Sequence, residues 1–344
     1  MEHAPHSKAS EPVTMARVRP LLKWAGGKRQ LLPALAEHYP SGFNRYFEPF
    51  FGSGAVFFDL LSQGRLADVP VRLSDVNADL VGCYRVVRES AGAVIEALDR
   101  LQTEHRRRGN AFYYEVRDRR FNPARLELLR AGSDAMVDGY TPELAAMLVY
   151  LNRTGFNGLF RLNRAGAFNV PVGRYANPRI CDAPHIEAVA SAFRQPNVRF
   201  DCRPFDRALV DAGRNDFVYC DPPYEPLSPT ASFANYTASG FTMFDQARLR
   251  HAVVAAALRG AFVVVSNSSA PAIEAEYQQR SAKTAKLVLS YVPARRAINS
   301  RASARGVVNE VIVSNVQSRL ASIKPRMARM PVASRPAVRR RRSA

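Results

Sequence analysis

The chain has 344 residues, 47% of them hydrophobic, and its 49 Lys and Arg residues outnumber its 30 Asp and Glu residues, which gives a formal net charge of +19. This length permits one large domain or two modest ones with a buried core. No stretch has the pattern of a membrane-spanning helix or of a secretory signal, so we expect a cytoplasmic protein. The basic charge predicts a polyanionic partner, with nucleic acid favoured over an anionic membrane surface.

The two ends of the chain differ in composition from the part between them. Residues 1–19 and 317–344 are rich in Pro, Ala, Ser and charged residues and show no apolar periodicity. We therefore expect a disordered N-terminal extension and a disordered basic tail. The tail has nine Lys or Arg residues and no acid, but the rest of the chain is basic without it.

Between these ends, short apolar runs alternate with stretches of helical periodicity. Strands are predicted over residues 45–50, 71–75, 197–201, 217–221, 261–266, 286–292 and 307–314. Helices are predicted over residues 55–62, 78–104, 142–151 and 245–258. This alternation predicts an α/β fold with an open, mainly parallel sheet that binds ligands at the carboxyl ends of its strands. The loop between the last two strands has no room for a helix, so we expect an antiparallel hairpin at the sheet edge.

Residues 86–199 interrupt the alternation of strands and helices. They begin with a helical pattern, and residues 152–164 then combine Gly and Asn with aromatic and Arg residues, as is typical of a loop or hairpin. We predict that they form an inserted second domain, within a core made of residues 20–85 and 200–316. The four cysteines are widely spread and form no C-x-x-C pair, so we expect free thiols and no bound metal.

Two glycines, Gly52 and Gly54, lie between a predicted strand and a predicted helix. Glycines there let the backbone approach a ligand closely, although a tight turn without a ligand explains two glycines equally well. Asp75 ends the next predicted strand, where a carboxylate can accept hydrogen bonds from both hydroxyls of a ribose. The third glycine of a dinucleotide fingerprint is absent, so a single nucleoside such as S-adenosyl-L-methionine fits better than NAD. The Gly-Gly-Lys string at 26–28 lacks the rest of a phosphate-loop pattern, which argues against ATP.

The segment Asp221-Pro222-Pro223-Tyr224 ends another predicted strand. Two prolines cannot continue a strand, and they make the turn stiff. A stiff turn suits methyl transfer to an exocyclic amine, because the Asp221 carboxylate and the Pro222 carbonyl can both accept its N–H bonds. The Tyr224 ring offers a stacking face for a base taken out of a duplex. The alternative is a turn that only ends the strand, although a chance match of four residues is uncommon.

Together these motifs make the sequence similar to the DNA adenine methylase (Dam-like) family of amino-methyltransferases over most of residues 20–316. The matching motifs are L-K-W-A-G-G-K at 22–28, E-P-F-x-G-x-G at 48–54, S-D-x-N-x-D-L at 74–80, L-N-R-x-G-F-N-G-L at 151–159, F-N-V-P-x-G-R-Y at 168–175, D-P-P-Y at 221–224 and R-R-x-I-N-S at 295–300. The resemblance implies a Rossmann-like methyltransferase core with an inserted, mainly helical target-recognition domain that contains a β-hairpin. It also implies that S-adenosyl-L-methionine is the methyl donor and that adenine N6 in DNA is the acceptor.

The resemblance assigns roles to single residues. The implied catalytic residues, around a flipped adenine, are Asp221, Pro222, Pro223 and Tyr224. The predicted cofactor-binding residues are Trp24, Lys28, Glu48, Phe50, Gly52, Gly54, Asp75 and Asp221. The predicted DNA-binding residues are Lys23, Arg153, Phe156, Asn157, Leu159, Arg161, Arg174, Asn299, Ser300 and Arg301. Among these, Arg161 occupies the position expected to contact guanine and Phe156 that of an aromatic residue supporting the opened base pair, with GATC as the expected site.

Other functions remain open at this point. On composition alone, residues 153–174 also suit a surface loop whose arginines contact only phosphates. A cytosine-N4 methyltransferase usually has Ser at the place of Asp221, and a protein glutamine methyltransferase usually has Asn there. A non-catalytic DNA-binding protein on an inactive methyltransferase core need not keep Asp75, Asp221 and Tyr224. We expect a monomer that acts on double-stranded DNA without a metal or a membrane, either alone or beside a restriction nuclease.

Overall fold

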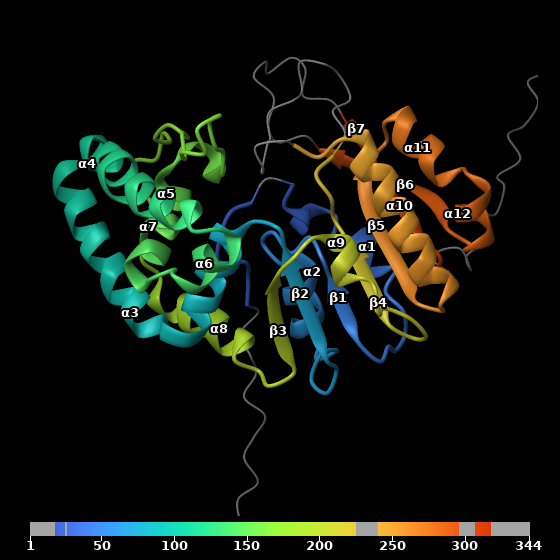
Figure 1. Ribbon diagram of the computed structural model, residues 1–344. Coiled ribbons are helices and arrows are strands. Elements are labelled where there is room, and N and C mark those ends of the chain that lie inside the picture. The colour runs from blue at the N-terminus through green and yellow to red at the C-terminus, as the bar shows by residue number, and fades with distance from the viewer. Residues whose placement is uncertain (1–17, 25, 225–239, 296–306, 318–344) are drawn as a thin grey trace, which may run out of the picture.

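A seven-stranded sheet runs through the centre of the described part of the chain (Figure 1). The structure is a computed structural model, and it describes residues 18–24, 26–224, 240–295 and 307–317. The strands are β1 (Tyr46–Glu48), β2 (Val71–Asp75), β3 (Val198–Cys202), β4 (Phe217–Cys220), β5 (Phe262–Ser268), β6 (Val288–Arg295) and β7 (Val307–Ser314). Their order is β3-β2-β1-β4-β5-β7-β6, parallel from β3 to β5, with β7 antiparallel to both β5 and β6.

Helices lie on both sides of this sheet. The helices of the first half are η1 (Lys28–Gln30), α1 (Leu32–Ala36), α2 (Ala55–Ser62), α3 (Ala78–Arg108), α4 (Asn110–Glu115), the π-helix η2 (Val116–Phe121), α5 (Asn122–Arg130), α6 (Ser133–Asp138) and α7 (Pro142–Thr154). They are followed by η3 (Phe156–Gly158), α8 (Ala183–Phe193), α9 (Phe205–Ala208), α10 (Met243–Leu258), α11 (Pro271–Tyr277) and α12 (Arg280–Thr284). Helices α3 to α8 gather beyond the β3 edge of the sheet, whereas α10 to α12 lie beside the strands at its other end (Figure 1).

All seven predicted strands are present, and the predicted antiparallel edge is confirmed as β6 and β7. β1 ends at Glu48, before the predicted end, because Pro49 has no N–H with which to continue the ladder. β6 begins at Val288, two residues later than predicted, since Lys286 has a positive φ of 58° and turns the chain there. The α/β fold class with a mainly parallel sheet is therefore confirmed.

The four predicted helices are present as α2, α3, α7 and α10. The bounds of α2 are those predicted, and α3 and α7 extend beyond their predicted ends, to Arg108 and Thr154. α10 begins at Met243, two residues before the predicted Asp245, because Thr242 is its N-cap residue and forms a capping box with Asp245. Helices α1, α4 to α6, α8, α9, α11 and α12 were not predicted; most are only four to seven residues long, too short to show a clear 3.6-residue period.

Strand β4 is buried on both faces. Phe217 and Tyr219 pack in one hydrophobic cluster with side chains of α2, α3, α7 and α8. Val218 and Cys220 pack in the other cluster, with side chains of α10 and α11. A strand covered on both sides has a continuous apolar sequence, as expected in a parallel sheet. Asp221, directly after β4, is therefore the first charged residue to follow this apolar strand.

The segment after α7 contains the region for which a β-hairpin was predicted. Its antiparallel pairing is confined to two isolated bridges, Leu162 with Phe168 and Gly155 with Val172, rather than to regular strands. The amide of Asn122 holds it in place: its Oδ1 accepts from the Phe168 N–H at 2.8 Å, and its Nδ2 donates to the Phe168 carbonyl at 2.9 Å. The division into a core and an inserted recognition domain stays a prediction.

Candidate active site

Asp221 lies in a cluster of polar side chains at the carboxyl end of β4. Its Oδ1 is 2.8 Å from the Lys28 Nζ and accepts a hydrogen bond from the Ser266 hydroxyl at 3.1 Å. Tyr219 in turn bonds to Ser266, at 3.0 Å. Burial raises the pKa of Asp221, and the Lys28 ammonium and the Ser266 hydroxyl act in the opposite direction. The carboxylate is thus fixed in place, and its charge is balanced by one ammonium group.

The rest of the Asp-Pro-Pro-Tyr turn is held by residues that the sequence analysis missed. Gln246, on α10, donates from Nε2 to the Pro223 carbonyl at 3.1 Å. Tyr224 donates its hydroxyl to Glu310 Oε2, on β7, at 2.5 Å. Gln246 is almost fully buried and is itself oriented by Asn267. These partners lie in other elements of the fold and form no local motif with the turn.

The Pro222 carbonyl differs from the other polar groups of the turn. The Asp221 carboxylate, the Pro223 carbonyl and the Tyr224 hydroxyl each have a side-chain partner. No hydrogen bond to the Pro222 carbonyl is found within the described residues, although this residue is buried. A buried acceptor is normally satisfied, so this carbonyl is available to a donor from a ligand. That this carbonyl and Asp221 accept from a single amino group stays a prediction.

The Lys28 side chain links the two halves of the site. Its ammonium is 2.8 Å from Asp221 Oδ1 and 4.4 Å from the centroid of the Tyr224 ring, and it donates to the Gly26 carbonyl at 2.6 Å. Its side chain is only 4% exposed. A buried ammonium requires such partners, because desolvation without them is costly. Lys28, predicted from the Gly-Gly-Lys string, therefore lies against the catalytic turn.

The two predicted glycines have conformations that other residues adopt at a cost. Gly52 has φ of 48° and Gly54 has φ of 70°. A Cβ on Gly54 would lie 2.3 Å from the Phe51 ring, and a Cβ on Gly52 would lie 3.0 Å from the Trp24 ring. The turn therefore requires glycine at both positions, and it keeps the backbone close to Trp24.

Asp75 joins this glycine turn to the end of β2. Its Oδ2 accepts the Gly52 N–H at 3.0 Å, and its Oδ1 accepts the Asn77 N–H at 2.9 Å. Burial raises its pKa, whereas these backbone N–H groups lower it. Each carboxylate oxygen keeps a further lone pair, so the group can still accept hydrogen bonds from the two hydroxyls of a ribose. The residues present thus fit a nucleoside-containing methyl donor.

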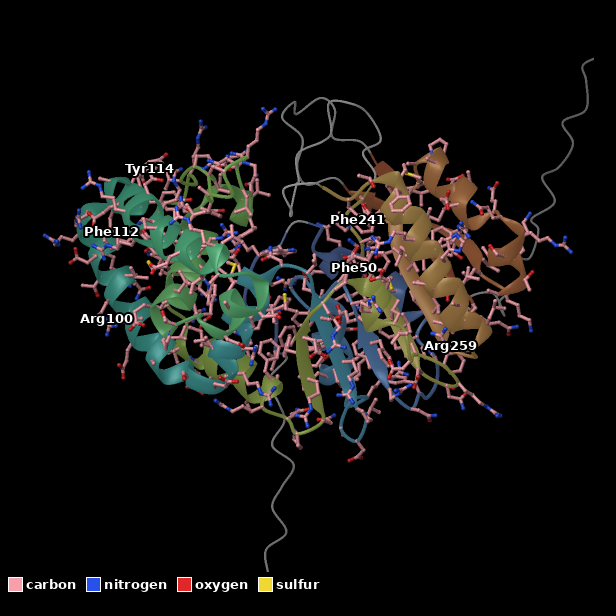
Figure 2. All side chains as sticks on the ribbon, viewed as in Figure 1. Phe50, Arg100, Phe112, Tyr114, Phe241 and Arg259 are labelled. Atoms are coloured by element: carbon pink, nitrogen blue, oxygen red, sulfur yellow. The ribbon has the colours of Figure 1, made fainter. Side chains whose placement is uncertain are left out.

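Glu48 and Phe50, also predicted to bind the cofactor, lie between β1 and the glycine turn, Glu48 as the last residue of the strand. Glu48 is 2% exposed and accepts the Tyr46 hydroxyl at 2.8 Å; burial raises its pKa well above the usual range. Phe50 is half-buried and packs against Phe205, with ring centroids 5.3 Å apart. It also packs against Phe241, with centroids 5.8 Å apart (Figure 2). Neither presents a polar group at the surface, so any role in cofactor binding stays a prediction.

The motif around Trp24 contacts the segment after α7. The Trp24 ring stacks on Phe160, with centroids 5.5 Å apart. Asn152, which was not predicted as a site residue, accepts the Lys23 N–H at 2.8 Å and donates to the Lys23 and Gly158 carbonyls at 2.7 and 2.9 Å. These contacts of Trp24 and Lys23 join residues far apart in sequence, so the predicted cofactor motif packs directly against the predicted DNA-contacting segment.

Among the predicted DNA-binding residues, some face solvent. Phe156 is 43% exposed, an unusual environment for a large aromatic side chain. Asn157, which follows it, is exposed and has φ of 54°, and Arg174 is exposed as well. Leu159 is half-buried and packs against the core. Lys23 places its ammonium over an aromatic ring, 4.6 Å from the centroid.

Two predicted arginines have partners within the chain. Arg161 donates from Nε to the Asn169 side chain at 2.8 Å, so its guanidinium has a fixed direction. Arg153 donates to the backbone carbonyls of Arg179 and Ile180 at 3.2 Å, and burial lowers its pKa. Its role in contacting DNA stays a prediction. The remaining three predicted residues, Asn299, Ser300 and Arg301, lie outside the described residues.

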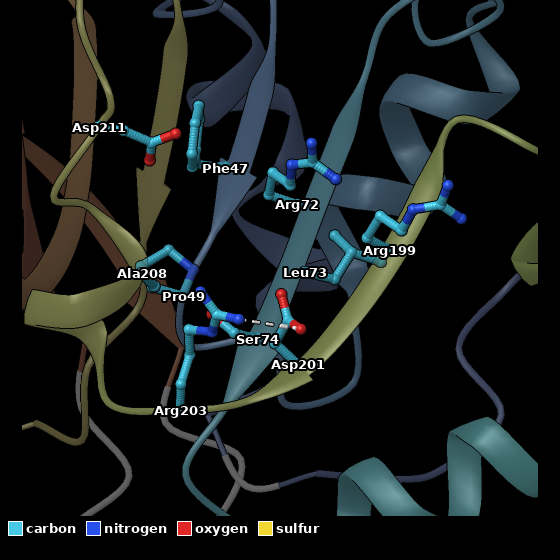
Figure 3. A pocket seen from close by; sticks show the side chains of 10 residues that line it. All are labelled: Phe47, Pro49, Arg72, Leu73, Ser74, Arg199, Asp201, Arg203, Ala208 and Asp211. Carbon is cyan, nitrogen blue, oxygen red and sulfur yellow. Dashed lines mark ion pairs between the residues drawn. The ribbon is translucent and has the colours of Figure 1, made fainter.

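A cavity of about 360 Å³ lies elsewhere, along β1, β2 and β3 (Figure 3). Arg72, Arg199 and Arg203 line it, and Arg203 pairs with Asp201 at 3.1 Å. None of the predicted site residues lines this cavity. The candidate active site is therefore defined by its motifs and their contacts, not by this cavity.

Several known proteins are similar to this chain. The family model of the D12 class N6 adenine-specific DNA methyltransferases matches residues 24–291. The chain is 37% identical over 299 residues to Type II methyltransferase M1.LlaDCHI of Lactococcus lactis subsp. cremoris, which covers 87% of this chain and 95% of that protein. It is 38% identical over 260 residues to Type II methyltransferase M.MjaIII of Methanocaldococcus jannaschii, with 73% and 84% covered. It is 33% identical over 298 residues to the DNA adenine methylase of Escherichia coli K12, with 87% and 95% covered.

These findings bear on the predicted chemistry. Within the residues that the structure describes, no three His, Cys, Asp or Glu side chains are grouped to hold a metal ion, and no helix is long and apolar enough to cross a membrane. The predicted enzyme class, an adenine-specific DNA methyltransferase that uses S-adenosyl-L-methionine as methyl donor, is confirmed by the matched family. The chain therefore belongs to the D12 class of N6 adenine-specific DNA methyltransferases.

Proposed function

We propose that this protein takes an adenine out of duplex DNA and transfers a methyl group from S-adenosyl-L-methionine to its N6 atom, within the sequence GATC. The observation that carries this proposal is the pair of acceptors formed by the Asp221 carboxylate and the Pro222 carbonyl on a stiff turn. Asp75, the candidate ribose ligand, ends β2, and β1 separates β2 from β4. Both groups thus lie at the same edge of the sheet, where parallel sheets bind ligands.

An exocyclic adenine amine is a weak nucleophile, because its lone pair is delocalised into the ring. The two acceptors can counteract this delocalisation. When both N–H bonds point at Asp221 and Pro222, the nitrogen can become more tetrahedral and direct its lone pair out of the ring plane. The bound cofactor supplies an activated methyl group on a sulfonium. Methylation leaves a positive charge on N6, and the Asp221 carboxylate is the nearest base for the proton that is lost. Positioning and electrostatic stabilisation account for the catalysis, without a covalent enzyme intermediate.

The surroundings of the turn support an extruded base as the substrate. The Tyr224 ring is a stacking face next to Asp221, and the Lys28 ammonium now lies over it. A base that stacks on this face takes the place of the ammonium, which has the Gly26 carbonyl as another partner. The exposed Phe156 ring is suited to enter the space that an extruded base leaves in the duplex.

Residues 86–199 are proposed to recognise the target, within a catalytic core formed by residues 20–85 and 200–316. In this proposal Arg161 contacts guanine, since a guanidinium can donate to both O6 and N7 of that base. Its bond to Asn169 supports this role, because it limits the directions in which the guanidinium can point. Phosphate contacts from the exposed Arg174 would add affinity without sequence preference.

Transfer of a labelled methyl group to synthetic duplexes tests the proposal. A duplex that contains one GATC site should be methylated on adenine, and a duplex of the same composition with the site scrambled should not. The Asp221→Ala variant should lose transfer while its circular dichroism spectrum remains that of the folded protein, although loss of the partner of Lys28 lowers its melting temperature. Label on cytosine would instead indicate an N4 methyltransferase, and DNA binding without any transfer would indicate an inactive methyltransferase core.

A further inference from the structure

The Tyr224 hydroxyl has a partner from a distant part of the chain. Glu310 lies on the antiparallel strand β7, in register with Ser268 at the end of β5. This register brings a residue from the beginning of β7 to the edge of the sheet at which β4 ends with Asp221. The Tyr224 hydroxyl donates to Glu310 Oε2 at 2.5 Å, a distance typical of a hydrogen bond between a hydroxyl and a carboxylate.

We propose that Glu310 is a positioning residue, which holds the Tyr224 ring where an extruded base can stack, and that it acts through the Tyr224 hydroxyl alone. This inference rests on the proposed function. A tyrosine ring attached to a turn has rotational freedom about its side-chain bonds, so a stacking surface requires a second point of attachment. The hydroxyl of Tyr224, at the far end of the ring, provides that point.

The choice of a carboxylate at position 310 supports this role. Glu310 raises the pKa of Asp221, so a second negative charge near the catalytic carboxylate has an electrostatic cost. A neutral acceptor would avoid that cost, but it would bind the phenolic hydroxyl less strongly. The Lys28 ammonium, 2.8 Å from Asp221 and 4.4 Å from the centre of the Tyr224 ring, offsets part of the repulsion.

The other groups of the turn are restrained in the same way. Ser266 holds the Asp221 carboxylate and Gln246 holds the Pro223 carbonyl. Glu310 holds the Tyr224 ring. Among the hydrogen bonds of the described residues, this is the only one that restrains the ring itself. Its loss should therefore affect stacking of the base and the transfer step more than binding of the duplex.

A double-mutant cycle tests the proposal. Single-turnover methyl transfer, the KM for DNA and the fluorescence of a 2-aminopurine placed at the target position are measured for Glu310→Ala, Glu310→Gln, Tyr224→Phe and the double variants. We expect Glu310→Ala to slow transfer about 10-fold to 100-fold, Glu310→Gln to slow it less, and the KM for DNA to change less than about threefold. In the Tyr224→Phe background the same changes at Glu310 should have no further effect, because the hydroxyl is already absent. The control is Glu96→Ala, an exposed residue of α3, which should change none of these quantities.

Several results would overturn the proposal. Equal slowing by Glu310→Ala with and without the Tyr224 hydroxyl would show that Glu310 acts elsewhere, and a wild-type rate for Glu310→Ala would show that it has no role. If Glu310→Ala does not fold, the nearly isosteric Glu310→Gln decides by the same comparison. Asp221→Ala separates this inference from the proposed function. If that variant is inactive and the Glu310 variants are normal, only the inference fails, whereas an active Asp221→Ala refutes the proposed function itself.

Discussion

A buried ion pair connects the start of α3 to the segment of predicted DNA contacts, and its removal should cost much of the stability of the protein. Arg125 donates from Nε to both oxygens of Asp79, at 2.9 and 2.8 Å, and from Nη1 to the Gly166 carbonyl. The two side chains are each 3% exposed. Arg125→Met leaves the Asp79 carboxylate buried without its partner, which typically lowers the free energy of unfolding by about 3–5 kcal/mol.

The destabilisation caused by Arg125→Met should increase with pH. Burial raises the pKa of Asp79 to about 6, although Arg125 acts to lower it. Because this folded-state pKa lies above the ordinary value, the contribution of the carboxyl to stability is complete below about pH 4 and is lost as the pH rises through 6. Without Arg125 the pKa of Asp79 rises further, so the stability of the variant continues to fall up to a higher pH than that of the wild type. Arg125→Met should therefore be destabilising most strongly at pH 8 and less at pH 5, where the carboxyl is protonated in both proteins.

Urea unfolding at pH 5 and pH 8 measures this difference, with the wild type compared at each pH so that other titrating groups cancel. The double variant Asp79→Asn with Arg125→Met has no buried charge, and its loss of stability relative to the wild type should be about 1–2 kcal/mol at pH 8 and larger at pH 5, where the protonated Asp79 stabilises the wild type. This trend is opposite to the one expected for Arg125→Met. Equal destabilisation by Arg125→Met at the two pH values would refute the reasoning.

Three further predictions concern the cofactor turn, the catalytic carboxylate and the tail. Gly54→Ala should lower stability by at least about 1–2 kcal/mol, because the left-handed φ is strained for alanine and its Cβ would overlap the Phe51 ring; a thermal unfolding midpoint equal to that of the wild type would contradict this. Lys28→Gln should move the acid limb of the pH–kcat profile to higher pH, since the ammonium lowers the pKa of Asp221 and activity requires the ionised carboxylate; an unchanged or lower midpoint in methyl-transfer assays is the opposing result. Deletion of residues 317–344 should weaken DNA binding and flatten its salt dependence in fluorescence titrations while methylation continues, and complete loss of turnover in the truncated protein would be evidence against it.

The parts of the fold that depend on local sequence were predictable. Two strand ends are marked by residues that force the chain to turn, Gly52 and Gly54 after β1 and the two prolines after β4. Asp221 was identified from the proline turn, and Asp75 from its place at the end of the strand that follows the glycine turn. The structure confirms where these side chains lie, and the roles assigned to them remain to be tested by the substitutions described above.

The residues that hold the site together were not predictable in the same way. Ser266, Gln246 and Glu310 reach the catalytic turn from β5, α10 and β7, and their contacts depend on sheet order and register, which no local pattern encodes. Arg153 illustrates the converse case. Its residue type and neighbours predicted a contact with DNA, whereas in the structure its guanidinium donates to backbone carbonyls. A guanidinium has five N–H donors that suit a phosphate, a base edge or several carbonyls, so residue type alone does not determine its partner. The packing of the chain around it does, and it places the Leu21, Arg179 and Ile180 carbonyls within hydrogen-bond distance of the Arg153 guanidinium, whose contact with DNA stays a prediction.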